Sequence, residues 1–255
     1  MDPLDRPPVV PISRVKRALA GLKRLTERRT GVADPHMGSM YAAMMTATKV
    51  RLRFAKHGDL RLISHHDLMR CLERLLRRAQ IPTATSQGFN PRPKVVFTLA
   101  LALGIEGRRE VVELELAEPM EPDEVLRRLR ATTPQGLEWL EVEGVPPGRA
   151  AQPESVTYLL EIPAERRDEG RNRLAAFLAS EQWPYTRHRP DRTVAIDLRP
   201  FLLEAELDSL GLLRFRMKML PSGSARPEEI IDALGLRDLL GQGSVLVRTE
   251  VELVP

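Results

Sequence analysis

The chain of 255 residues is 42% hydrophobic and 29% charged, so it is long enough to bury one large core or two of ordinary size. It carries 39 Lys and Arg residues against 35 Asp and Glu residues, and its pI is about 9.5. Its single cysteine, Cys71, excludes an internal disulfide framework, a cysteine zinc site and a cysteine-ligated iron–sulfur cluster within this chain. No apolar run approaches the roughly 20 residues that cross a bilayer, and no signal peptide is visible. We therefore expect a cytoplasmic protein without a cofactor.

Residues 1–46 differ from the rest of the chain, because prolines interrupt their start and no strand pattern follows. Residues 13–29 have the spacing of a basic amphipathic helix. Met37, Met40 and Met44 are alternative start sites, after which a regular pattern begins. We expect residues 1–46 to be a flexible basic leader, and the alternative is an arm that binds RNA or an acidic surface.

Residues 47–146 show the pattern of one α+β domain. Residues 49–56 alternate apolar and basic side chains, which is typical of a half-buried strand. Ser64 is placed to cap a helix that extends to about Ala79, with Asp67 three residues after the cap. The other expected elements are strands at 94–103 and 109–117, a helix at 121–134 and a strand at 137–145. This order of strands and helices is that of a ferredoxin-like (βαββαβ) unit.

A linker rich in proline and glycine, residues 146–155, precedes a second stretch in which a similar order returns. We expect residues 155–255 to form a second ferredoxin-like domain. Its expected strands cover 155–163, 185–188, 193–209, 211–220 and 244–254, and its expected helices cover 164–181 and 226–236. The predicted fold class is therefore α+β, with two tandem ferredoxin-like (βαββαβ) domains and antiparallel sheets.

Basic charge is concentrated in the first domain. Residues 51–94 hold ten Lys or Arg against three Asp or Glu, whereas residues 106–143 hold five against eleven. A basic patch favours a polyanion such as RNA, or an acidic partner protein. The expected helix at 64–79 buries leucines on one side, and its other side carries Arg70, Arg74, Arg77 and Arg78. The alternative is an ordinary solvated helix face, with Arg77 paired to Glu73.

Residues 86–94 form an unusual loop after that helix. Gly88 tolerates a positive φ angle, and Pro91 and Pro93 stiffen the backbone around Arg92. An arginine held in this way suits bidentate contact with phosphate or carboxylate, and Phe89 would stack on a base. The alternative is a crossover loop whose phenylalanine packs in the core. The residues of this loop that we expect to bind are Ser86, Gly88, Phe89, Asn90, Arg92 and Lys94.

His65 and His66 begin the expected basic helix, where free backbone N–H groups disfavour a protonated imidazole. Either histidine is a candidate general acid or base, with His57 and Asp59 on the approach. Neighbouring helical residues point about 100° apart, so both histidines are not expected to serve one site. The alternative is a capping or hydrogen-bonding role. Because the local sequence offers too few ligands, we expect no metal site.

The strand RLRFAK, the helix start SHHDLMR, the segment ERLLRRA and above all the loop SQGFNPRPK lie within residues 51–116. In these features the chain resembles a bacterial family of radical-SAM-linked proteins, a domain of unknown function, from Lys49 to the C-terminus. The resemblance implies a radical SAM partner protein, encoded beside this one or fused to it. This chain lacks the Cys-x-x-x-Cys-x-x-Cys pattern, so any such cluster would belong to the partner. The expected architecture is more distantly similar to CRISPR repeat-processing endoribonucleases, some of which use a histidine near the first helix.

These features predict a non-catalytic binding or accessory module for a radical SAM partner enzyme. It would recognise RNA or another anionic substrate through the basic helix and the loop at 86–94. The alternative is a metal-independent endoribonuclease or RNA-processing enzyme with His65 or His66 as general acid or base. A third hypothesis is an adaptor that binds only proteins. None of the three involves a membrane.

Overall fold

A computed structural model describes residues 47–188, 191–220 and 223–255. These residues belong to the unit Thr46–Pro255. The expected leader at 1–46, with its helix at 13–29, lies outside the described residues. No helix within the described ranges is long and apolar enough to cross a bilayer.

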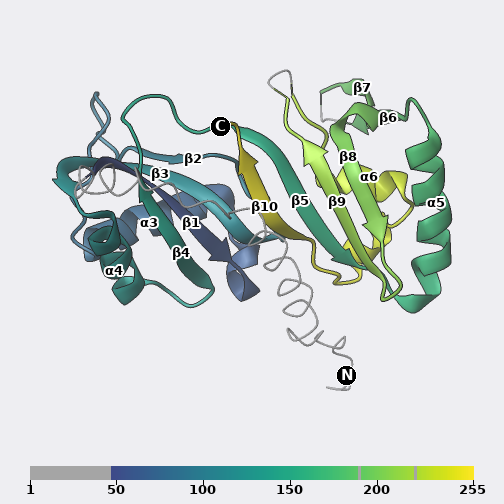
Figure 1. Ribbon diagram of the computed structural model, residues 1–255, viewed down its shortest axis with the longest axis horizontal. Coiled ribbons are helices and arrows are strands. Elements are labelled where there is room, and N and C mark those ends of the chain that lie inside the picture. The colour runs from purple at the N-terminus through teal and green to yellow at the C-terminus, as the bar shows by residue number, and fades with distance from the viewer. Residues whose placement is uncertain (1–46, 189–190, 221–222) are drawn as a thin grey trace, which may run out of the picture. The chain divides into compact units, whose positions relative to one another are not determined.

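The first half of the unit supplies four strands and two α-helices to the fold (Figure 1). β1 pairs antiparallel with β3 on one side and β4 on the other, and β2 pairs antiparallel with β3. The strand order in this half is therefore β4-β1-β3-β2. The elements are β1 (Ala47–Lys56), η2 (Gly58–Leu62), α3 (His65–Arg78), β2 (Val95–Phe97), β3 (Glu106–Met120), α4 (Pro122–Thr132) and β4 (Leu137–Gly144).

The second half has the strand order β10-β5-β9-β8, and all three pairings are antiparallel. β6 and β7 pair only with each other, as a separate two-stranded sheet. The elements are β5 (Pro153–Glu161), η3 (Ala164–Arg166), α5 (Arg167–Ala179), β6 (Pro184–His188), β7 (Thr193–Asp197), η4 (Arg199–Phe201), β8 (Leu202–Leu207), β9 (Leu212–Lys218), α6 (Pro227–Ala233), α7 (Arg237–Gly241) and β10 (Val247–Leu253).

A short parallel pairing joins the two halves into one eight-stranded sheet. Val247 and Arg248 of β10 pair with Glu106 and Gly107 at the start of β3. β2 is too short to cover this part of β3, and β10 uses the backbone groups left unpaired at its edge. The prediction of an α+β fold with a mostly antiparallel sheet is confirmed, but the sheet is continuous where two separate sheets were expected.

Two hydrophobic clusters pack on the sheet, one formed by the first half and one mainly by the second half, to which Leu101, Ile105 and Val111 of the first half also belong. In the first half, Val50, Leu52 and Phe54 alternate inward from β1, as the sequence pattern predicted, and are almost fully buried. The ring of Phe54 packs against Trp139 at 5.6 Å and Phe97 at 5.8 Å between centroids. Burial of a side chain of this size contributes about 1.5–3 kcal/mol to the free energy of unfolding. This aromatic cluster therefore stabilises the face of the sheet on which α3 and α4 pack.

Two expected strands are shorter than the sequence pattern suggested. The strand predicted at 94–103 ends at Phe97, because the chain turns away and the carbonyl of Ala100 accepts a hydrogen bond from the buried Arg248. The strand predicted at 193–209 breaks into β7, a 3-10 turn and β8. Pro200 lies in that turn and has no N–H to donate, while the Asp197 carboxylate accepts from the Arg199 backbone N–H. Helix α7 was not predicted.

Candidate functional site

Helix α3 begins at a side-chain cap and is held by a leucine stripe. Ser64 Oγ accepts a hydrogen bond from the Asp67 backbone N–H at 3.1 Å, and it donates to the Asp67 carboxylate at 2.7 Å. The predicted N-cap is therefore confirmed. Leu68, Leu72 and Leu75 are almost fully buried against the sheet. This packing fixes which side of α3 faces outward.

The outward side of α3 carries the four predicted arginines, which we call the basic face: Arg70, Arg74, Arg77 and Arg78. All four are exposed. Arg70 makes a loose ion pair with Asp67 at 3.7 Å, and Arg78 donates to the Thr132 carbonyl at 3.4 Å. Within the described residues, the side chains of Arg74 and Arg77 have no ion pair, and the alternative Arg77–Glu73 pair is not formed. A surface hollow of about 510 Å³ is lined by Cys71, Arg74, Arg77, Arg78 and Pro134.

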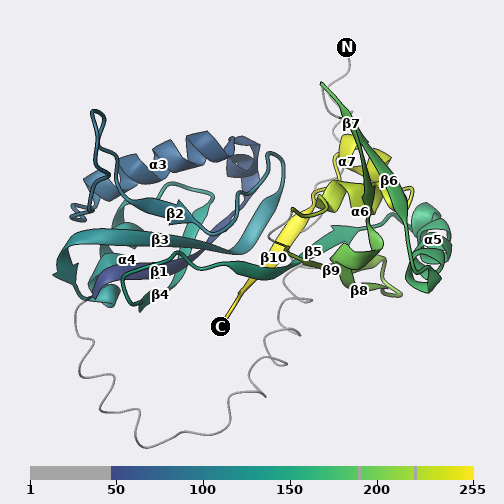
Figure 2. The ribbon, with the colours of Figure 1, turned by 90° about the horizontal axis from the view of Figure 1, so that it is seen from above.

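After α3 the chain forms a projecting hairpin, residues 83–94, which we call the arm (Figure 2). Its base is tied to β3, because Ala84 N donates to the Glu115 carbonyl at 2.9 Å and Glu115 N donates to the Lys94 carbonyl at 3.1 Å. Farther out, Ser86 N donates to the Arg92 carbonyl at 2.8 Å, and Arg92 N donates to Ser86 Oγ at 3.1 Å. Ser86 thus closes the arm just below its tip.

The tip of the arm is fully exposed. Gly88 has a φ of +131°, a conformation that only glycine adopts readily. Phe89 is 106% exposed, so the alternative that it packs in the core is wrong. Asn90 and Arg92 are also exposed, and no ion pair joins the Arg92 guanidinium to any residue in the described ranges. Lys94, at the base, pairs with Glu115 at 2.7 Å and is therefore partly neutralised.

The two candidate catalytic histidines have different environments. His65 is half-buried and packs edge-on against Phe97, with ring centroids 5.1 Å apart. Burial, followed by the nearby His66 and Lys56, lowers the pKa of His65. His65 Nδ1 is buried and has no hydrogen-bond partner among the described residues. His66 is exposed, and its ring centroid lies 6.3 Å from that of His65.

The other residues proposed beside these histidines are not joined to them by side-chain hydrogen bonds within the described residues. Within the described ranges, no hydrogen bond joins the side chains of His57 or Asp59 to either His65 or His66. His57 donates its backbone N–H to the Gly136 carbonyl at 2.9 Å, which is a structural contact. No set of three or more His, Cys, Asp or Glu side chains in the described part of the chain is placed to hold a metal ion.

The sequence analysis missed a buried group of charged and polar side chains near the place where β3 meets β10, which we call the junction cluster: Lys56, Glu110, Tyr158 and Arg248. Arg248 Nε donates to Glu110 Oε1 at 2.8 Å, Nη2 donates to the other carboxylate oxygen, and both side chains are 3% exposed. Although burial lowers it, the Glu110 carboxylate raises the pKa of Arg248 above its ordinary value. Burial lowers the pKa of Lys56, whose Nζ donates to the Ile63 carbonyl at 3.4 Å.

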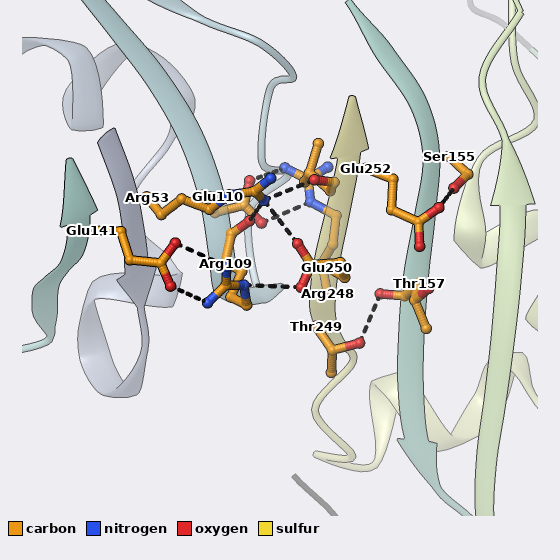
Figure 3. Close-up of polar contacts among 11 residues, drawn as sticks. Arg53, Arg109, Glu110, Glu141, Ser155, Thr157, Arg248, Thr249, Glu250 and Glu252 are labelled. Carbon is orange, nitrogen blue, oxygen red and sulfur yellow. Dashed lines mark hydrogen bonds and ion pairs between the residues drawn. The ribbon is translucent and has the colours of Figure 1, made fainter. Parts of the chain in front are cut away.

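Further ion pairs near the same junction join side chains of strands β1, β3, β4 and β10. Figure 3 shows Arg109 reaching both Glu141 and Glu250, at 2.8 and 2.9 Å. Arg53 also pairs with Glu250 at 2.8 Å and donates to the Val251 carbonyl at 2.8 Å. Strand β10 alternates apolar and charged residues, so nothing in its sequence marked Arg248 as buried, and nothing local identified Glu110 as its partner.

The fold and the surface define an α+β protein that presents a basic helix beside an exposed, hydrogen-bonded arm. Residues 49–227 match the family model described as "Uncharacterized protein conserved in bacteria (DUF2344)", and the chain belongs to this family. No curated protein matches the chain.

Among solved structures, the chain is similar to one chain of "Crystal Structure of a Cbf5-Nop10-Gar1 Complex", with 14% identity and a TM-score of 0.40. The similarity covers 80% of this chain and 49% of that one, so the present chain spans about half of its length. We draw nothing about function from a likeness of this size.

Proposed function

We propose that this protein is a non-catalytic binding module that recognises single-stranded RNA through the arm and the basic face. The observation that carries the proposal is the position of Phe89, fully exposed at the tip of the arm. Stacking of a base on an exposed aromatic ring contributes about 1–3 kcal/mol and tolerates any base. The arm is already closed by the Ser86 and Arg92 hydrogen bonds, so little ordering remains to oppose binding.

Electrostatics favours the same ligand. Arg74, Arg77 and Arg92 have no ion pair within the described residues, so each guanidinium is available to a phosphate. Arg70 and Arg78 lie eight residues apart on α3, which corresponds to about 12 Å along the helix axis. The basic face is therefore longer than a single phosphate group, so its arginines can contact successive phosphates of one RNA chain. The arm follows directly from the C-terminal end of this face, so base stacking and phosphate contacts can act on one ligand.

The resemblance described above supports a radical SAM enzyme as the partner to which this module presents its ligand. With only Cys71, this chain has no ligand set for the partner's cluster. We also propose that the fold is a pair of fused ferredoxin-like units. The support is the strand order in the large sheet. When β6 and β7 are left out and the strands of each half are numbered in chain order, β4-β1-β3-β2 and β10-β5-β9-β8 both have the antiparallel order 4-1-3-2.

Fluorescence anisotropy of the full chain with a labelled single-stranded RNA tests the RNA proposal. Phe89→Ala should weaken binding by about five- to a hundredfold, which corresponds to the loss of about 1–3 kcal/mol of stacking. Arg77→Ala with Arg78→Ala should weaken binding and reduce the salt slope by about one unit for each arginine that neutralises a phosphate in the wild type. The matched control is Arg171→Ala on α5, where the arginine pairs with Asp168 and the helix packs on β8.

Equal affinity of the wild type, Phe89→Ala and the arginine double variant would refute the proposal. Cleavage of the RNA in EDTA, abolished in His65→Ala or His66→Ala, would instead establish the endoribonuclease alternative. Retention of a partner protein with no affinity for RNA would establish the adaptor.

A further inference from the structure

A cavity of about 640 Å³ lies at the centre of the eight-stranded sheet, apart from the arm and the basic face. Its floor is the face of β10, β5 and β9, and its walls are the loop between β2 and β3, strand β6 and the start of α6. Small-molecule sites typically have volumes of about 300–1,000 Å³. The cavity therefore has the size of a site for one small ligand.

The floor of the cavity is mainly apolar. It is formed by Val156, Tyr158 and Met217, which are each at most 3% exposed in total, with Ile105 beside them. The ring of Tyr158 stacks on Phe215, with centroids 5.3 Å apart and an angle of 22° between the planes. An apolar floor backed by stacked rings suits a flat apolar or aromatic group.

Strand β6 and helix α6 form the wall that faces the β2–β3 loop. Two pairs of polar side chains join them, Arg187 with Glu229 and Tyr185 with Asp232. Arg187 donates to both carboxylate oxygens of Glu229, at 2.6 and 2.7 Å, and its Nη2 also donates to the Ser224 carbonyl at 3.1 Å. Tyr185 donates to the Asp232 carboxylate at 2.7 Å. Since β6 does not join the large sheet, these contacts hold the wall in place and keep the cavity formed without a ligand.

The cavity lining carries charges of both signs. The Arg187 guanidinium neutralises Glu229, whereas Glu228 and Asp232, which accepts only from the neutral Tyr185 hydroxyl among the described residues, keep their charge. Arg226 and Arg237 are exposed, line the cavity, and have no ion pair within the described ranges. Arg237 Nη1 donates to the Glu228 carbonyl at 3.5 Å, so both guanidinium groups keep donors that can contact one anionic group of a ligand.

We infer that this cavity binds a small organic anion, in which an aromatic group enters between the β2–β3 loop and β6 and an anionic group contacts Arg226 and Arg237. The anionic group is a phosphate, as in a nucleoside monophosphate, or a carboxylate, as in an aromatic acid. This site does not depend on the RNA surface and shares none of its residues.

The fluorescent probe 1-anilinonaphthalene-8-sulfonate has this chemistry, an aromatic body with one anionic group. Titrated into the full chain, it should bind saturably with one site per chain. Arg226→Ala with Arg237→Ala should raise its Kd at least tenfold and leave the weaker binding of N-phenyl-1-naphthylamine, which lacks the sulfonate, unchanged. Ala102→Trp, on the exposed β2–β3 loop, should fill the cavity and abolish both. The matched control, Arg77→Ala with Arg78→Ala, should change neither, so that failure here and failure of RNA binding are separable.

Unchanged melting temperatures ensure that each variant is folded. Displacement of the probe by adenosine monophosphate identifies the phosphate ligand, and displacement by indole-3-acetate identifies the carboxylate ligand. The inference would be overturned if the probe did not bind saturably, or if neither compound displaced it. Equal binding of the probe by the wild type and the Ala102→Trp protein would also overturn it.

Discussion

Replacing Glu110 by Gln tests whether the junction cluster holds the two halves of the sheet together. The substitution keeps the shape of the side chain but leaves Arg248 buried without a counter-charge, with Lys56 nearby. Breaking a buried pair in this way costs about 3–5 kcal/mol. For a unit of this size, each kcal/mol lowers the melting temperature by about 2–4 °C, so the melting temperature should fall by about 6–20 °C.

Urea denaturation of the full chain measures this destabilisation directly. The control is Glu143→Gln, because Glu143 pairs with Arg51 at 3.0 Å but is 60% exposed, and removing its charge should cost less than about 1 kcal/mol. The double substitution Glu110→Leu with Arg248→Met removes both charges and should recover most of the stability. A destabilisation below about 1 kcal/mol for Glu110→Gln would refute the reasoning.

Three further results are expected. Arg92→Ala should weaken RNA binding about ten- to a hundredfold, since a charge-assisted contact contributes about 1.5–3 kcal/mol; the melting temperature should not change, and Arg92→Lys should restore only part of the affinity. Gly88→Ala strains the arm tip at a φ of +131° and should lower RNA affinity without changing the urea midpoint; an unchanged affinity would mean that the tip conformation is not used. The pKa of His65 in the folded chain is lower than its ordinary value of 6.5. At a pH just below 6.5, the imidazole is therefore protonated in more of the unfolded chains than of the folded chains. Stability should therefore fall as pH drops through this range, and His65→Leu should be destabilised less between pH 7 and pH 5 than the wild type; equal changes would contradict this assignment.

Local pattern was sufficient for the elements on which the basic face depends. The alternation in β1 and the leucine spacing in α3 reflect which side of each element is buried, and that side is visible in neighbouring residues. Ser64 and Asp67 interact within one turn, so the start of α3 was also predictable. Once the leucines face the sheet, the arginines of α3 must face outward.

The sequence predicted the stiffness of the arm but not the position of Phe89. Gly88, Pro91 and Pro93 restrict the backbone through their own covalent structure, which any sequence reveals. A phenylalanine in a loop is compatible with both core packing and full exposure. The choice depends on the anchoring of the arm to β3, through residues more than twenty positions away.

Only the tertiary structure decided how the two halves meet. The parallel pairing of β10 with β3 depends on an edge that β2 leaves open, and no periodicity within either strand indicates it. Glu110 and Arg248 lie 138 positions apart, so nothing local matches one charge to the other. The central cavity likewise depends on β6, which pairs with β7 outside the large sheet and is joined to α6 by side-chain hydrogen bonds. Short-range chemistry determines helices, caps and turns, whereas strand partners, buried ion pairs and cavities depend on which distant surfaces come into contact.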